Sequence, residues 1–252
     1  MTQVSKSYGP RGVLFWTLLG MSVGCAQKPV PDAAERTRIS EWRSMAASAR
    51  SASALAELRK RARSGMVEAQ SALGQALCQQ SDLGLRGEGL AWLRSAANSR
   101  DSAALLALGK LELSGGSVQP DYHAALLHLR AAAEQGEPRA SYYLGVMARS
   151  GYGEPADHAA AAQLLGVAAD HGFPQAMFLL ANAYRDGDGV PRDEQRALAL
   201  YQKAAELDHP ESIQALAMAY QNGELGLARD QERFRSELAE LAHAQRHAPS
   251  AP

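Results

Sequence analysis

Apolar residues in the middle of the chain recur at the spacing of amphipathic helices. Two neighbouring segments show this best, residues 175–186 and the residues that follow Asp193. The apolar positions of the two segments are Ala176, Leu179, Leu180, Ala183 and Tyr184, and then Ala197, Leu200, Tyr201, Ala204 and Ala205. Steps of three and four residues place each set on one helix face. The Gly-rich stretch 187–191 separates the segments, and Asp193 is placed to cap the second helix, so the pattern predicts a two-helix unit.

The two-helix pattern repeats along the chain with a period of 36 residues. Leu-Gly or Leu-Ala pairs follow one another at spacings of 35, 36, 36 and 36 residues. They begin at Leu73, Leu108, Leu144, Leu180 and Leu216. Paired alanines share the period, and Gly136 and Gly172 mark helix ends where a left-handed cap suits glycine. A fixed period of this length is typical of a solenoid in which repeats stack to bury a shared core.

Composition supports helices and excludes several other classes. The 252 residues include 49 alanines and four phenylalanines. Alanine is the best helix former and β-branched residues are scarce, so an all-α chain is expected and a sandwich or Rossmann fold is disfavoured. Paired alanines let neighbouring helices approach closely while Leu, Tyr and Trp fill the layers between them.

Charge argues against a nucleic-acid partner. The chain has 26 basic and 27 acidic residues, and its first 24 residues carry Lys6 and Arg11 but no acid. Without that segment the balance is 24 − 27 = −3. A slightly acidic protein lacks the basic surplus that nucleic-acid binding usually needs.

The N-terminal segment 1–24 has the organisation of a secretory signal. A basic start is followed by the eleven-residue apolar run 13–23, which is too short to span a bilayer. Ser22-Val23-Gly24-Cys25 resembles a bacterial lipoprotein cleavage box, although the family usually has Leu at the position of Ser22. The resemblance implies that Cys25 is acylated and becomes the mature N-terminus. The alternative is an ordinary signal cleaved nearby, with Cys25 free or removed.

The residues after Cys25 bear on the destination of an anchored chain. Ala26-Gln27-Lys28 lacks the Asp that commonly retains such lipoproteins in the inner membrane. An outer-membrane lipoprotein facing the periplasm is therefore expected. Only Cys78 would remain besides Cys25, so no disulfide within the mature chain is expected.

The repeat itself resembles a known family. Residues 176–205, and closely 140–169, follow Ala-x-x-x-Leu-Gly-x-x-Tyr-x-x-Gly-x-Gly-Val, then Asp, Ala and Ala-Ala. This pattern is similar to the Sel-one-like repeat (SLR) family, a longer relative of tetratricopeptide repeats, and the likeness covers about residues 65–241. It implies a right-handed α-solenoid of stacked antiparallel helix pairs. The expected organisation is a signal (1–24), a tether (25–39), N-terminal capping helices (40–65), five repeats of which the last is a cap (66–245), and a disordered tail (246–252).

No nucleotide-binding loop, Ser-His-Asp motif or paired-cysteine metal signature is present, so no enzyme, cofactor, metal or small-molecule substrate is expected. Asp186-Gly-Asp188-Gly189 imitates a calcium loop but lacks its later ligands, which favours an ordinary turn. His243 and His247, with Glu240, have zinc-compatible spacing, but histidines at a helix C-terminus are equally explained by the helix dipole.

Two further signals have both a functional and a plain interpretation. The basic run 59–63 is suited to anionic lipid headgroups, or is simply a solvated helix face. Cys78 is either a reactive thiol or an inert small apolar residue. In both cases the plain interpretation is preferred.

These observations favour a lipid-anchored scaffold or adaptor that binds another protein through a concave helical groove. Family resemblance also allows an immunity protein that neutralises a secreted effector toxin, and a hydrolase ranks below both. Tetratricopeptide geometry implies groove positions two and five residues on either side of the conserved Leu. The predicted groove residues are Leu106, Lys110, Arg139, Tyr142, Val146, Arg149, Gln175, Phe178, Asn182, Arg185, Gln214, Met218 and Gln221, with Glu211 beside them. Tyr142, Phe178, Arg149 and Arg185 are the expected hot spots, unless the two aromatics only pack against adjacent helices.

Overall fold

The structure is a computed structural model that describes residues 29–47, 51–115 and 119–247. Within these ranges every regular element is an α-helix. In chain order the helices are α1 Ala33–Ala47, α2 Ala52–Arg63, α3 Val67–Cys78, α4 Leu83–Ala97, α5 Ser102–Ser114, α6 Tyr122–Ala133, α7 Pro138–Ser150, α8 His158–Asp170, α9 Pro174–Asp186, α10 Glu194–Ala205, α11 Pro210–Asn222 and α12 Gln231–His247. The predicted all-α solenoid is confirmed.

Local chemistry sets the ends of these helices. In the repeats, the second helix of each pair begins directly after an aspartate. The carboxylate of this aspartate accepts a hydrogen bond from a backbone N–H of the first turn, as Asp193 does from Arg196 at 2.9 Å. Proline occupies the first turn of α7, α9 and α11. Gly136 and Gly172 have φ angles of +78° and +80°, so the left-handed backbone predicted there is confirmed.

The recurring Leu-Gly pair is where the two helices of a repeat meet. A Cβ added to Gly109 of α5 would lie 2.6 Å from Leu129 Cγ of α6, and one added to Gly145 of α7 would lie 2.9 Å from Leu165 Cγ of α8. In the later repeats the equivalent residue is Ala181 or Ala217, and both are buried. The 36-residue period therefore follows this contact between paired helices.

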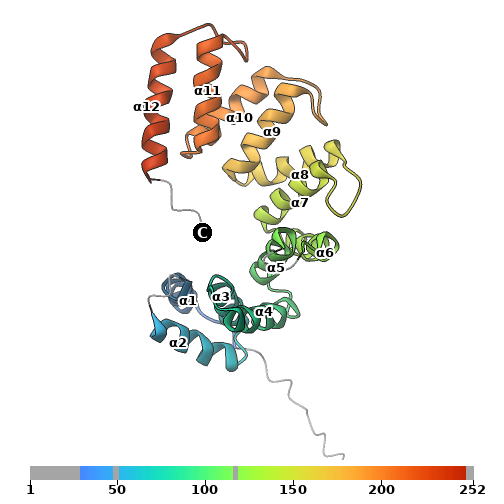
Figure 1. Ribbon diagram of the computed structural model, residues 1–252, viewed down its shortest axis with the longest axis vertical. Helices are drawn as coiled ribbons and strands as arrows, with labels where there is room; N and C mark the ends of the chain where they lie inside the picture. Colours follow the sequence, from blue (N-terminus) through green and yellow to red (C-terminus); the bar gives the residue numbers. More distant parts are fainter. Residues whose placement is uncertain (1–28, 48–50, 116–118, 248–252) are drawn as a thin grey trace, which may run out of the picture.

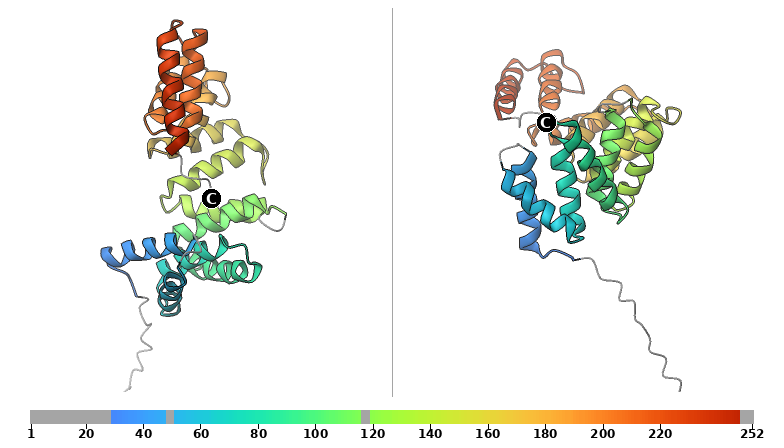
Figure 2. Two further views of the ribbon diagram at one scale, coloured as in Figure 1. Left: turned by 60° about the vertical axis from the view of Figure 1, so that its left-hand side comes forward. Right: turned by 60° about the horizontal axis from the view of Figure 1, so that its bottom comes forward.

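Stacking of the pairs produces an arc. Each helix packs against its neighbours in the chain, and the first helices also contact one another, α3 with α5 and α5 with α7. In Figure 1 the arc runs from α1–α4 through α5–α8 to α9–α12 around a hollow, with α5 and α7 on the inner side and α6 and α8 outside. Figure 2 shows the same stack of helix pairs from two further directions. The inner surface of the arc is therefore built mainly by first helices.

The Gly-rich loops tie one repeat to the next. Gly189, in the loop after α9, lies against the start of α8, because an added Cβ would be 2.0 Å from the carbonyl oxygen of His158. Beside it, a carboxylate oxygen of Asp188 lies 2.5 Å from His158 Nδ1, and the other lies 3.4 Å from Arg149 Nε. These contacts fix the angle between consecutive repeats.

The two ends differ from the sequence-based boundaries. The expected tether reached residue 39, but α1 begins at Ala33, because Asp32 caps it by accepting from Glu35 N at 2.7 Å and Ile39 is buried in the core. The expected disordered tail began at residue 246, but α12 continues to His247. The signal, Cys25 and residues 248–252 lie outside the described residues. No helix in the described ranges has the length and apolarity needed to cross a membrane.

The loop contact yields a matched pair of glycine substitutions. Gly187→Ala should cost about 1–2 kcal/mol, because its φ of +73° disfavours a Cβ but the nearest atoms lie at 3.6 Å or beyond. Gly189→Ala, at a φ of +75°, should cost about 1–3 kcal/mol more, because the new Cβ collides with the α8 backbone. Urea denaturation of both variants measures the difference. Equal losses would show that the loop does not pack on α8.

Candidate functional site

Several residues that the sequence offered as candidate metal ligands make ion pairs within the chain. Within the described residues no cluster of three or more His, Cys, Asp or Glu side chains is placed to hold a metal ion. Asp186 pairs with Arg185 at 2.8 Å, and Asp188 pairs with His158 and Arg149. Both aspartates of the calcium-like loop thus have basic partners within the chain, and the loop joins α9 to α10.

The basic run on α2 is partly neutralised in the same way. Arg59 donates two hydrogen bonds to the Glu88 carboxylate, at 3.0 and 2.7 Å. Arg61 pairs with Glu35 at 3.0 Å and with Glu57. Half of the cluster thus fastens α2 to α1 and α4, which leaves the inner face of the arc as the candidate functional surface.

The first helices carry the predicted groove residues at three levels of exposure. The exposed ones are Lys110, Arg139, Arg149, Gln175, Arg185, Gln214 and Met218, with Glu211, and the half-buried ones are Tyr142, Val146, Phe178, Asn182 and Gln221. Leu106 corrects the expectation that the core does not need these side chains, because it is only 4% exposed and packs in the core formed by α5–α7. Repeat geometry alone could not show that contacts with α6 and α7 bury this side chain.

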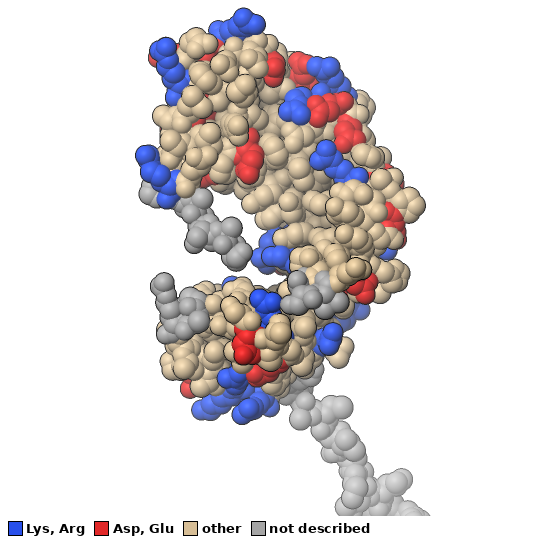
Figure 3. All heavy atoms as spheres, in the orientation of Figure 1, with Lys and Arg blue, Asp and Glu red and all other residues tan. Residues whose placement is uncertain are grey.

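Part of the predicted groove is a real cleft between α3, α5 and α7. Its volume is about 490 Å³, and Leu106, Lys110, Arg139 and Cys78 line it. The groove prediction did not include several other lining residues, among them Arg43 and Tyr143. Arg43 lies on α1, before the first repeat, so the repeat period assigned it no position. Tyr143 directly precedes Leu144 and is not at one of the positions two or five residues from that leucine, so the groove geometry did not select it. In Figure 3 Lys and Arg spheres border the hollow of the arc.

All the charged side chains that line the cleft are cations. The Lys110 ammonium lies 5.6 Å from the centre of the Tyr143 ring, and Arg43 Nη1 donates to Gln75 Oε1 at 3.1 Å. Arg139 pairs with Glu137, outside the cleft lining, at 2.9 Å. Burial raises the pKa of the Cys78 thiol and outweighs the opposing effect of the nearby Arg86 charge, which favours the inert interpretation.

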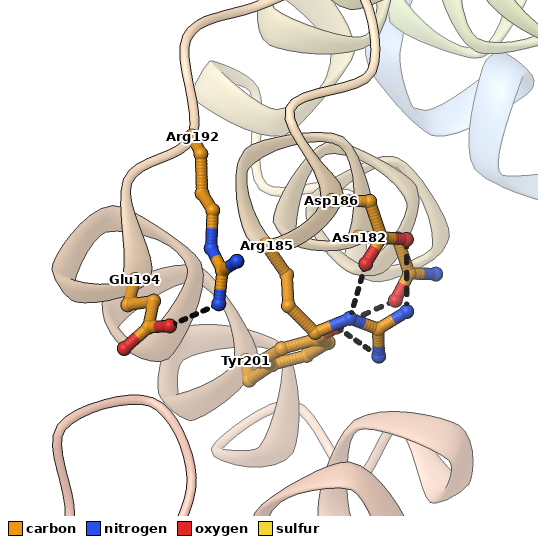
Figure 4. Close-up of polar contacts among 6 residues, drawn as sticks. All are labelled: Asn182, Arg185, Asp186, Arg192, Glu194 and Tyr201. Atoms are coloured by element: carbon orange, nitrogen blue, oxygen red, sulfur yellow. Dashed lines mark hydrogen bonds and ion pairs between the residues drawn. The ribbon is translucent and has the colours of Figure 1, made fainter.

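A hydrogen-bond chain fixes the groove residues of α9 (Figure 4). Arg185 donates to the Tyr201 hydroxyl at 3.3 Å, and that hydroxyl, on a fully buried ring, donates to Asn182 Oδ1 at 2.5 Å. The amide oxygen of Asn182 is thereby occupied, which leaves its NH₂ group as the donor available to a ligand. Arg185 also binds Asp186 and lowers the pKa of that carboxyl group. Both side chains are held in one orientation before any partner arrives.

The two aromatic residues predicted as binding hot spots, Tyr142 and Phe178, contact other aromatic rings of the chain. The Tyr142 ring lies 4.9 Å from Phe173 and 5.1 Å from Tyr143 in edge contacts, and burial raises the pKa of its hydroxyl. Phe178 lies 5.9 Å from Tyr201 and 5.4 Å from His209. Each ring therefore packs against adjacent helices while part of it remains on the inner surface.

Comparison with protein families identifies the repeat. A model of the Sel1 repeat matches residues 67–101, 102–137, 138–173, 174–209 and 210–233. The chain belongs to the Sel1 repeat family. Proteins with Sel1 repeats are generally protein–protein interaction scaffolds. A comparison with curated proteins finds no match.

Solved structures share the Sel1 architecture. A Sel1 repeat protein from Oxalobacter formigenes is 25% identical, with a TM-score of 0.71 over 88% of this chain and 90% of that one. A protective antigen of uropathogenic Escherichia coli with an SLR fold is 24% identical, with a TM-score of 0.56 over 83% of this chain and 55% of that one. A Pseudomonas aeruginosa protein is 15% identical, with a TM-score of 0.54 over 87% of this chain and 84% of that one.

Proposed function

We propose that this Sel1 repeat protein is a scaffold that binds a partner protein along the inner face of its arc and is held at the outer membrane by a lipid on Cys25. The observation that carries the binding proposal is the inner face itself. Its exposed side chains come from consecutive first helices, and several are fixed by hydrogen bonds or ring contacts within the chain. Fixed side chains lose little conformational entropy on binding, which favours affinity.

Arg185 and Arg192 provide a matched test of the binding face. Both are exposed arginines paired with one neighbouring carboxylate, Arg185 on the inner helix α9 and Arg192 in the loop before α10 (Figure 4). Arg185→Ala should weaken partner binding by about 2 kcal/mol, roughly thirtyfold, whereas Arg192→Ala should leave it nearly unchanged. Thermal melts should move little for either, because exposed ion pairs contribute only about 0–1 kcal/mol.

A photo-crosslinking amino acid first identifies the partner. It is placed at Met218, 42% exposed on α11, and separately at Val167, 48% exposed on α8. A partner protein should be captured from Met218 and not from Val167. Capture from Val167 alone would place binding on the outer face and contradict the proposal. The identity of the captured protein also separates a scaffold from an immunity protein.

The anchor is tested independently of the partner. With Cys25 as the acylated mature N-terminus, mass spectrometry of the membrane fraction should find a lipid-modified peptide that begins at Cys25. Cys25→Ala should release the protein from membranes, because the apolar chains that hold it are lost. Unchanged membrane association of Cys25→Ala, or an unmodified N-terminus elsewhere, would contradict the anchor and leave the binding face untouched.

A further inference from the structure

The cleft between α3, α5 and α7 continues along one face of α3. A smaller hollow of about 180 Å³ adjoins it, and both are lined by Arg43, Gln75 and Ala103. From Glu68 in the smaller hollow to Cys78 in the larger, the α3 lining spans ten residue steps, or about 15 Å at the helical rise of about 1.5 Å. We call this continuous depression the α3 cleft. It is long enough for about five residues of extended chain at about 3.3 Å each.

The larger part of the α3 cleft has a one-sided charge. Arg43, Lys110 and Arg139 line it, from three different helices, and no Asp or Glu does. Elsewhere in the described chain arginines commonly hold a carboxylate, as Arg59 and Arg130 do. Lys110 and Arg43 make no ion pair within the described residues, so two of the three cations lack a carboxylate partner. Cations that converge on a cleft from separate elements suit a ligand that brings its own carboxylates.

The floor of the same cleft is apolar. Leu93 is fully buried and Leu106 nearly so, while Ala103 and Ala107 leave the space above them open. An aliphatic or aromatic side chain placed there would gain the free energy of removing apolar surface from water. The smaller hollow is different, because Glu68 and Asp101 line it beside Arg36 and Arg43. Charge complementarity therefore places the ligand's carboxylates at the Lys110–Arg139 end.

We propose that the α3 cleft binds an extended, acidic segment of a partner protein that carries at least one large apolar side chain, with its carboxylates on Arg43, Lys110 and Arg139. The proposal rests on the scaffold function, for which it names the chemistry of the recognised segment. It concerns α1–α7, whereas the scaffold test uses α9 and α11, so the two can fail separately.

Cys78 supplies a reporter within the cleft. The chain has two cysteines, so in the full chain carrying Cys25→Ser the only thiol is that of Cys78 in the cleft lining. Three fluorescein-labelled hexapeptides serve as probes: acidic Asp-Glu-Leu-Glu-Phe-Asp, its amide analogue Asn-Gln-Leu-Gln-Phe-Asn, and basic Lys-Arg-Leu-Lys-Phe-Lys. Fluorescence anisotropy measures affinity, and the rate of maleimide addition to Cys78 reports occupancy of the cleft.

The acidic peptide should bind about tenfold more tightly than the amide peptide, and the basic peptide should bind least. At saturation it should slow the modification of Cys78 several-fold, and high salt should weaken its binding. Lys110→Glu combined with Arg139→Glu should weaken binding about tenfold or more, because both exposed side chains would then repel the ligand. Lys203→Glu combined with Arg192→Glu, the same number of charge reversals at exposed positions on and just before α10, should alter it less than about twofold. If circular dichroism shows that the double variant has lost its helical structure, the affinity of Lys110→Gln and the salt dependence of binding serve as the test instead.

Three results would overturn the proposal. Equal affinity for all three peptides would show a cleft without charge selection. Tight binding of the acidic peptide without protection of Cys78, or with no effect of the Lys110 variants, would place the site elsewhere. If no peptide binds while the crosslinker at Met218 still captures a partner, the proposed role of the α3 cleft is contradicted and the scaffold function is not. Acidic binding with Cys78 protection supports the cleft even if Met218 captures nothing.

Discussion

The structure depends on how closely the two helices of each repeat approach one another. At the recurring Leu-Gly pair, the helix surface of Gly74, Gly109 or Gly145 has no room for a Cβ next to the leucine of the partner helix. The later repeats fit Ala181 and Ala217 at the same point. Such contact between helices compensates for a core made largely of alanine, because tight packing supplies the dispersion and burial that larger side chains would otherwise provide.

This close pairing also creates the surface that we assign to binding. The loops that contain Gly153 and Gly189 pack on α6 and α8 of the preceding repeats, and the first helices of the stacked pairs line the inside of an arc (Figure 1). Residues that do not enter the pair contact then face the hollow. Some of them support one another, as Tyr201 supports Asn182 and Arg185, so the inner face is ordered by the same packing that stabilises the repeats.

Much of this fold could be predicted from sequence, because its helix boundaries depend on short local motifs that recur in each repeat. The 36-residue period, the Asp193 cap and the left-handed Gly136 and Gly172 each depend on a few neighbouring residues, and the structure confirms them. The start of α1 at Ala33 was not predicted, because residues 25–39 were expected to form a tether, whereas the cap at Asp32 and the burial of Ile39 make a helix. A cap beside proline is a weaker signal than a repeated motif.

The candidate site was less predictable, because its details come from residues far apart in sequence. Arg43 reaches the α3 cleft from a helix outside the repeats, and Leu106 is buried by contacts with α6 and α7. No period encodes either fact. The hydrogen bond from Tyr201 to Asn182 joins residues 19 positions apart, and the 36-residue pattern gives no sign of it.

The claim that close approach of paired helices underlies the structure is tested most directly by the stability of Gly109→Ala. Urea denaturation measures this stability, with Gly166→Ala as the control. Gly166, inside α8, has open space around the position of a Cβ, so alanine there should stabilise the protein by about 0.5–1 kcal/mol through its helix propensity. At Gly109 the same propensity gain is opposed by a Cβ only 2.6 Å from Leu129, and the overpacking should reverse the sign to a net loss of about 1–2 kcal/mol. A gain at Gly109 equal to that at Gly166 would contradict the account.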